Sequence, residues 1–235
     1  MDVEGFNRAA DSFFQSGGRG LNITTPFKDD AYAYANSLTP RARRAGAVNT
    51  LALQPDGSIL GDTTDGVGLI RDITENLGWS IEGKKLLVLG AGGAVRGVLD
   101  PLLAAKPESV VVANRTAAKA VSLAKGFAGL GAIKGLGLDE LVESFDLVIN
   151  GTSVHLSKDS IQLPEIIMKN HTCAYDMAYG AEPTAFVLWA QSLCSNTSDG
   201  LGMLVYQAAE SFRIWRGVSP DVDRLINELR LKLSA

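Results

Sequence analysis

The chain has 235 residues, of which 46% are hydrophobic and 20% are charged, and its formal net charge is −4. This length allows one or two domains with a sizeable core, and the lack of a basic stripe argues against a nucleic-acid partner. No apolar run approaches the ~20 residues that span a bilayer. Two isolated cysteines and an acidic start without an apolar leader predict a cytoplasmic protein with reduced thiols.

The first part of the chain predicts a small α/β unit. Residues 6–15 have the character of a helix that ends at a glycine pair, and residues 21–24 read as a short strand. Pro26 then stands where a new helix can begin. Residues 49–54 and 59–62 flank a Pro-Asp-Gly-Ser turn, which favours a hairpin.

The middle of the chain predicts a second, larger unit. A helix over residues 65–77 leads into it, because apolar residues recur there at helical spacing. Short β-like runs then alternate with amphipathic stretches, which is typical of a Rossmann-like parallel sheet. Pro101 predicts a kink or an early end in the first helix of this unit. The predicted strands are residues 86–89, 109–113, 146–149 and 173–176, and the predicted final helices are residues 201–215 and 222–234.

A glycine turn follows the strand at residues 86–89 and precedes a helix. In such a turn, backbone N–H groups and the positive end of the helix can face a pyrophosphate. Gly90 and Gly92 match the first two positions of G-x-G-x-x-G, but Val95 occupies the third, so the strict pattern is not met. A tight connection without a ligand is the alternative to a dinucleotide site.

The end of the next strand distinguishes between the two nicotinamide cofactors. Enzymes that prefer NAD place an acidic residue here, whereas this chain has Asn114, Arg115 and Thr116, followed by Lys119. A guanidinium and an ammonium attract the 2′-phosphate of NADP. The pattern therefore predicts NADP, with a solvated basic helix start as the alternative.

Reduction of a carbonyl group needs a hydride and a proton donor. Lys28 lies at a strand-to-helix turn, and Asp65 lies at the predicted start of a helix. A lysine beside a carboxylate can supply the proton or orient the oxygen. Sequence spacing alone does not bring the two residues together, and a lone lysine is usually solvated.

Several segments resemble the shikimate dehydrogenase family, in particular its NADP-dependent bacterial members. The similarity runs the whole length of the chain and includes the segment GLNITTPFK, which ends at Lys28. The segments that carry the resemblance are residues 20–28, 46–50, 64–66, 90–94, 114–116, 175–179 and 199–207.

The resemblance implies a reaction and a role for each matching residue. The reaction is the reversible NADPH-dependent reduction of 3-dehydroshikimate to shikimate, in the route to aromatic amino acids. The implied roles are catalysis for Lys28 and Asp65; substrate binding for Thr24, Asn49, Tyr179 and Gln207; pyrophosphate binding for Gly90, Ala91, Gly92, Gly93 and Ala94; 2′-phosphate binding for Asn114, Arg115, Thr116 and Lys119; and nicotinamide contact for Met177 and Gly200.

The implied fold is α/β, with a Rossmann-like NADP domain at residues 66–199 and a smaller, discontinuous substrate domain at residues 1–65 and 200–235. Family members carry a leading strand and a Ser-x-Ser motif that precede the segment matching residue 6, and this sequence has neither. A misassigned start codon, a shortened piece and a true shortened paralogue are the explanations. A chain that is naturally this short is expected to bind substrate weakly.

Two other functions stay open at this point. A quinate/shikimate dehydrogenase would favour an acidic residue in place of Arg115, and a catalytically impaired NADP-binding remnant would fit the missing segment. His155 and His171 are interpreted as structural or surface residues, and the isolated histidines and cysteines exclude a metal site by their spacing. No membrane partner is expected, and the assembly is left open, a homodimer included.

Overall fold

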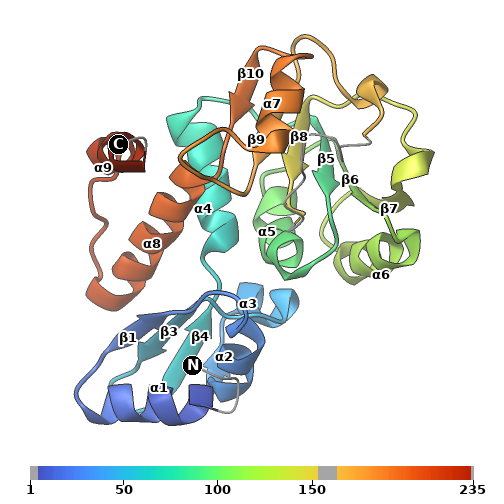
Figure 1. The fold of residues 1–235 in the computed structure, drawn as a ribbon. Coiled ribbons are helices and arrows are strands. Elements are labelled where there is room, and N and C mark those ends of the chain that lie inside the picture. Colours follow the sequence, from blue (N-terminus) through green and yellow to red (C-terminus); the bar gives the residue numbers. More distant parts are fainter. Residues whose placement is uncertain (1–4, 153–162, 234–235) are drawn as a thin grey trace.

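The computed structural model describes residues 5–152 and 163–233. The chain forms a small lobe around one sheet and a larger lobe around a second sheet (Figure 1). His155 lies outside the described residues. No helix in the described part is both long and apolar enough to cross a membrane.

The small lobe is built on a sheet with the strand order β1-β3-β4-β2. β3 and β4 form the predicted antiparallel hairpin, with Thr50 opposite Asp62. A core of buried side chains, among them Phe6, Val48 and Leu51, joins this sheet to its helices. The elements are α1 (Phe6–Gln15), β1 (Gly20–Asn22), α2 (Lys28–Tyr34), β2 (Ser37–Leu38), α3 (Pro40–Ala45), β3 (Thr50–Leu53) and β4 (Ile59–Asp62).

The larger sheet is parallel throughout its described strands, in the order β10-β9-β8-β5-β6-β7. From β5 the chain first adds β6 and β7 on one side and then adds β8, β9 and β10 on the other side. This arrangement creates a switch point between β5 and β8, where ligands of such folds bind. The predicted Rossmann-like α/β fold is confirmed.

The elements of this lobe are β5 (Lys85–Leu89), α5 (Gly93–Ala104), β6 (Ser109–Asn114), α6 (Ala117–Phe127), β7 (Ile133–Gly137), η3 (Leu138–Glu140), β8 (Leu147–Asn150), η4 (Glu165–Ile167), β9 (Cys173–Asp176), α7 (Ala185–Gln191) and β10 (Asn196–Ser198).

Both faces of the larger sheet are covered by helices. Successive side chains of a strand point to opposite faces, so they enter two different cores. Leu86 and Val88 of β5 belong to a core shared with α5 and α6. Leu87 and Leu89 belong to the opposite core, which includes Phe186 of α7. Continuous apolar runs in the sequence therefore become strands that are buried on two sides.

The chain between the lobes is helical, but it is not one uniform helix. The predicted helix over residues 65–77 is an α-helix, α4 (Asp65–Arg71), followed by a π-helical segment, η2 (Asp72–Asn76). Asp72 is buried within this segment and accepts a hydrogen bond of 2.6 Å from the hydroxyl of Tyr175. A local widening of this kind lets the helix meet a specific side-chain contact.

Of the kink or early end predicted at Pro101, the early end is wrong, because α5 continues through this residue to Ala104. Pro101 packs on Gly66, where an added Cβ would lie 2.6 Å from the ring. The missing side chain at Gly66 leaves room for the ring, and only three helical residues follow it.

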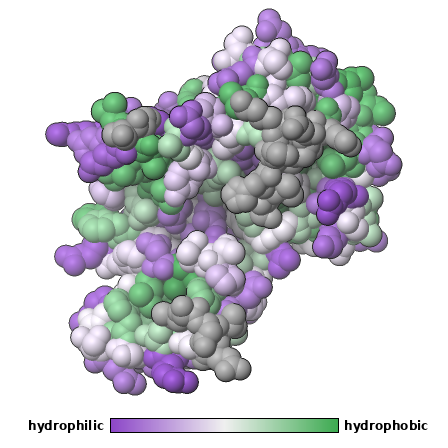
Figure 2. Space-filling model, viewed as in Figure 1, coloured by the Kyte–Doolittle hydropathy of each residue, from purple (hydrophilic) through white to green (hydrophobic). Residues whose placement is uncertain are grey.

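Two further helices end the chain, α8 (Leu201–Arg216) and α9 (Asp223–Leu233). α8 packs along α4 and also contacts β1 and β3 of the small lobe. An added Cβ on Gly68 would lie 2.7 Å from the backbone of Gln207, so α4 and α8 touch through their backbones. In Figure 2 the surface is indented between the two lobes, with hydrophilic residues inside the indentation.

Candidate active site

Lys28 and Asp65 form an ion pair at the junction of the two lobes. Lys28 is the first residue of α2, and Asp65 is the first residue of α4. The Lys28 Nζ lies 2.6 Å from the Asp65 Oδ2, and the two side chains are 26% and 12% exposed. The structure therefore brings together two residues that are 37 positions apart in the sequence.

The same pair lies beside the helix that follows the glycine turn. A Cβ added to Gly97 of α5 would lie 3.8 Å from the Asp65 Oδ2. Gly66 packs still closer, since its added Cβ would lie 2.8 Å from the Gly97 carbonyl oxygen. Small residues on both helices thus hold the carboxylate against α5.

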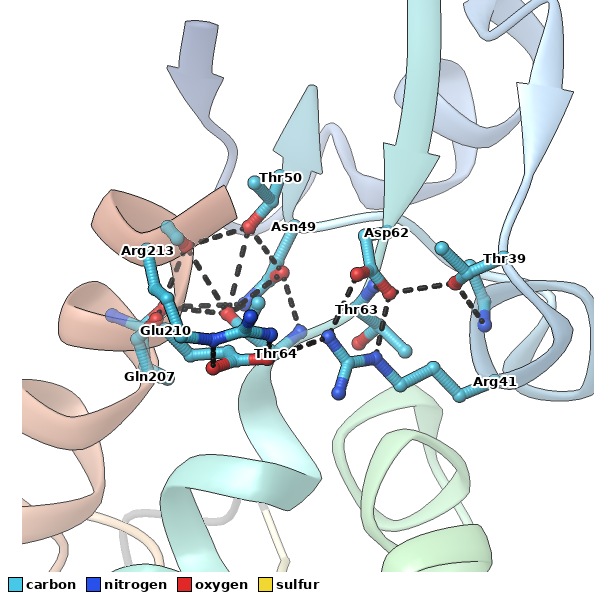
Figure 3. A network of polar contacts seen from close by, with 12 residues as sticks. Thr39, Arg41, Asn49, Thr50, Asp62, Thr63, Thr64, Gln207, Glu210 and Arg213 are labelled. Carbon is cyan, nitrogen blue, oxygen red and sulfur yellow. Dashed lines mark hydrogen bonds and ion pairs between the residues drawn. The ribbon is translucent and has the colours of Figure 1, made fainter. Parts of the chain in front are cut away.

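Asn49 holds the second oxygen of the Asp65 carboxylate. Its buried side-chain Nδ2 donates to the Asp65 Oδ1 at 2.8 Å. The same Nδ2 lies 3.2 Å from the Gln207 Oε1 (Figure 3). The Asn49 Oδ1 accepts from the Thr64 backbone N–H at 2.9 Å. The Asp65 carboxylate is therefore fixed at both oxygens, by Lys28 and by Asn49.

Several residues of this network were not predicted as site residues from the sequence. Thr50 and Thr64 are fully buried and meet Ser211 of α8, with 2.7 Å between the Thr50 and Ser211 hydroxyl oxygens. Ser211 follows Gln207 by one helical turn, so the polar residues that recur on one side of α8 were the available signal.

A second group of charged residues fixes the segment that leads to Asp65. Arg41 of α3 donates to both carboxylate oxygens of Asp62 at 2.7 Å and to Glu210 of α8 at 3.1 Å (Figure 3). A hydrogen bond from Arg213 and another from Arg41 lower the pKa of Glu210 to about 2, against the opposing effect of burial. This network ties α3, the end of β4 and α8 to one another.

The glycine turn opens at the switch point of the larger sheet. Gly90 has a φ of +104°, and its added Cβ would lie 3.1 Å from the Gly151 carbonyl oxygen after β8, so glycine is required there by the fold. Gly92 and Gly93 are exposed, and an added Cβ at either would meet no protein atom within 4 Å. The fold itself leaves this space open at the start of α5, as a cradle for an anionic group requires.

The end of β6 presents cations next to this turn. Arg115 and Lys119 are exposed, and neither forms an ion pair within residues 5–152 and 163–233. Asn114 donates a side-chain hydrogen bond to the Thr116 carbonyl at 3.1 Å, which shapes the turn into α6. These residues fit a dinucleotide with an additional phosphate.

The remaining predicted residues lie near the carboxyl end of β9 and in the loop after β1. Gly200 donates its N–H to the Ala178 carbonyl at 3.0 Å, and its added Cβ would lie 2.3 Å from the Met177 carbonyl oxygen. Tyr179 and Thr24 are exposed. Within the described residues, no hydrogen bond joins either side chain to Lys28 or Asp65.

Comparison with known proteins places these features in a family. Residues 1–51 match the shikimate dehydrogenase substrate binding domain, residues 72–173 match shikimate / quinate 5-dehydrogenase, and residues 200–230 match the shikimate 5′-dehydrogenase C-terminal domain. The shikimate dehydrogenase (NADP(+)) of Cellvibrio japonicus is 55% identical over 99% of this chain and 85% of its own length. That of Saccharophagus degradans is 53% identical over 96% of this chain and 84% of its own length.

Solved structures give the same result. A shikimate 5-dehydrogenase from Thermus thermophilus, in complex with NADP(H) and shikimate, is 32% identical with a TM-score of 0.84, over 99% of this chain and 85% of that one. An Ael1 enzyme from Pseudomonas putida is 42% identical with a TM-score of 0.90, over 97% of this chain and 84% of that one. The chain belongs to the shikimate dehydrogenase family.

Proposed function

We propose that the protein is an NADP-dependent oxidoreductase that interconverts 3-dehydroshikimate and shikimate. The observation that carries this proposal is the Lys28–Asp65 ion pair of 2.6 Å beside α5, the helix that follows the glycine turn. The curated relatives at 50–55% identity, such as that of Cellvibrio japonicus, bear the name of this activity. The reaction belongs to the synthesis of aromatic amino acids.

Lys28 acts at the substrate oxygen. When NADPH is bound it supplies the hydride, and negative charge then develops on the oxygen of the former carbonyl group. The Lys28 Nζ can donate a proton to this oxygen or stabilise its charge. Asp65 anchors the Nζ from one side, and Asn49 prevents the carboxylate from turning away.

The chain's own residues bind the cofactor in three places. Gly90, Ala91, Gly92, Gly93 and Ala94 form the turn for the pyrophosphate, because its glycines leave open space at the start of α5. Asn114, Arg115, Thr116 and Lys119 bind the 2′-phosphate at the end of β6. Met177 and Gly200 contact the nicotinamide.

Substrate lies between the lobes. Asn49 and Gln207 share a hydrogen bond of 3.2 Å within reach of Asp65, which supports a pocket lined by both. Thr24 and Tyr179 line the same pocket from the loops after β1 and β9. Residues 1–65 and 200–235 act as the substrate domain, and residues 66–199 act as the NADP domain. We infer a cytoplasmic location, with a homodimer as one assembly to be tested.

A survey of activity tests this proposal. The purified protein is incubated with shikimate or quinate and with NADP or NAD, and reduction of the cofactor is followed by its absorbance. Shikimate with NADP is expected to give the highest kcat/KM. Preference for quinate or for NAD would replace this function with that of a quinate/shikimate dehydrogenase, and no turnover with any pair would favour a non-catalytic NADP-binding protein.

A further inference from the structure

A positively charged cavity lies between the two lobes, next to the glycine turn. It has a volume of about 650 Å³ and is lined by Ala91 of the turn and by residues of α3, α5 and α6. Three cations are among the lining residues, and each comes from a different helix: Arg44 from α3, Arg96 from α5 and Lys119 from α6. α5 lies at the boundary of the lobes and contacts α3 of the small lobe and α6 of the larger one (Figure 1).

Arg96 is a cation without a counter-ion in this cavity. It lies in the first turn of α5, and its side chain reaches the small lobe, where a Cβ added to Gly46 would be 3.3 Å from the Arg96 Nη1. Within the described residues Arg96 forms no ion pair. A half-buried guanidinium that no carboxylate neutralises favours the binding of an anion.

Arg44 brings a second guanidinium from the small lobe. It pairs with Asp100 of α5, and the Arg44 side chain remains 42% exposed while that of Asp100 is 15% exposed. The lining residues of the cavity include three cations and no carboxylate, and Asp100 pairs only with Arg44 within the described residues. The cavity therefore has an excess of positive charge. A phosphate group is the anion that matches several guanidinium N–H donors at once.

We propose that Arg96 and Arg44 bind the 2′-phosphate of NADP together with Lys119. This inference rests on the proposed use of NADP. Lys119 belongs to α6, which begins just after the strand end where the adenosine ribose of a Rossmann-fold cofactor lies, and Ala91 belongs to the pyrophosphate turn. The preference for NADP over NAD then depends on a residue of the small lobe, so the cofactor joins the two lobes through Arg44.

Binding of two nucleotides by titration calorimetry tests this assignment without turnover. 2′,5′-ADP carries the 2′-phosphate, and 5′-AMP lacks it. Wild type is expected to bind 2′,5′-ADP at least about tenfold more tightly than 5′-AMP. Arg96→Gln and Arg44→Gln are each expected to weaken 2′,5′-ADP binding by about three- to tenfold and to leave 5′-AMP binding within about twofold.

Two matched variants separate phosphate binding from a structural effect. Asp100→Asn removes the ion pair of Arg44 but keeps its charge, so 2′,5′-ADP binding is expected to stay equal or become tighter. Arg43→Gln removes a neighbouring exposed charge on α3 that does not line the cavity. This variant is expected to bind both nucleotides with wild-type affinity.

Three results would overturn the inference: wild-type affinity for 2′,5′-ADP in both arginine variants, equal weakening by Asp100→Asn and Arg44→Gln, or no preference of wild type for 2′,5′-ADP. The outcome is independent of the proposed reaction. A protein that prefers 2′,5′-ADP but does not oxidise shikimate would refute the proposed reaction and still support the phosphate site.

Arg96→Lys retains the charge and is expected to bind 2′,5′-ADP more tightly than Arg96→Gln does.

Discussion

At the scale of single residues, the candidate site depends on the orientation of one carboxylate. Lys28 contacts one oxygen of Asp65, and Asn49 contacts the other, at 2.6 and 2.8 Å. A carboxylate that accepts directed hydrogen bonds at both oxygens loses its rotational freedom, and Lys28 Nζ is then held in one position. Asn49 therefore contributes to the geometry of the site as directly as the ion pair itself.

Asn49→Ala is predicted to reduce both activity and stability. The change removes one hydrogen-bond donor from Asp65 and leaves the buried backbone N–H of Thr64 without its acceptor. We expect the unfolding free energy to fall by about 1–3 kcal/mol. We expect kcat/KM for shikimate to fall at least about tenfold. Gln54→Ala, which removes an amide of the hairpin, is the control. An Asn49→Ala protein with unchanged kcat/KM would refute the positioning role.

Glu210 makes the stability of the fold depend on pH. Its pKa is about 2 in the folded protein, below the ordinary value of 4.5, so the carboxylate stabilises the fold above about pH 4.5 and loses this effect as the pH falls toward 2. Glu210→Gln is expected to lower the unfolding free energy by about 2–3 kcal/mol at pH 7 and by about half as much at pH 3.

Urea unfolding at these two pH values measures this difference. Glu75→Gln serves as the control, because Glu75 is exposed and its ion pair is with Arg71, four residues earlier in the chain. A Glu210→Gln deficit that is the same at pH 3 and pH 7 would contradict the assigned pKa.

At the scale of elements, the sequence predicted the parts whose signal is local. The buried run of β5, the turn at Gly90 and the following helix are contiguous, and they appear as predicted. The ends of elements were missed where tertiary contacts decide them. α5 continues through Pro101, whose ring packs on Gly66 of α4, and η2 is π-helical around the buried Asp72.

The same distinction applies to the site. Lys28 and Asp65 were identified through segments that resemble a family, whereas Ser211 and Arg41 act through partners 161 and 169 positions away in the sequence. The spacing of residues along the sequence cannot predict such contacts, because they arise only when α8 packs against the small lobe. The short strands β2 and β10, with two and three residues, also carry too little periodicity to predict.

The contact of α4 with α8 is predicted to be sensitive to one methyl group. Gly68→Ala would place a Cβ 2.7 Å from the backbone at Gln207 and Met203, so the helices must separate. We expect a loss of about 1–3 kcal/mol in unfolding free energy by urea titration and a higher KM for shikimate. Gly126→Ala in α6, where an added Cβ meets nothing within 4 Å, is expected to stabilise the protein slightly. The same sign of change in both variants would contradict this account.

At the scale of the whole molecule, the two lobes meet through charged and small residues. Arg44 pairs with Asp100 across this boundary, and Arg41 joins Asp62 to Glu210 of α8. A cofactor that binds at the boundary stabilises the folded chain by mass action. The magnitude depends on how far its concentration exceeds its Kd.

NADP is predicted to raise the thermal midpoint more than NAD at equal concentration. At about 100 times its Kd, NADP adds about 2.7 kcal/mol to the unfolding free energy, whereas NAD lacks the phosphate that Arg115 and Lys119 attract. Differential scanning fluorimetry at low salt checks this order. An equal shift by both cofactors would refute the assignment of these cations.

The most direct test of the Lys28–Asp65 pair is the turnover of Lys28→Ala. Saturating shikimate and NADP separate the chemical step from binding, and cofactor affinity is measured by titration in the same preparation. We predict that kcat falls about 10²- to 10⁴-fold while NADP affinity stays within about twofold. The control variant is Lys134→Ala, which removes an exposed lysine paired with Glu143 and is expected to keep wild-type turnover. A Lys28→Ala protein that turns over shikimate at the wild-type rate would contradict the catalytic role of the pair.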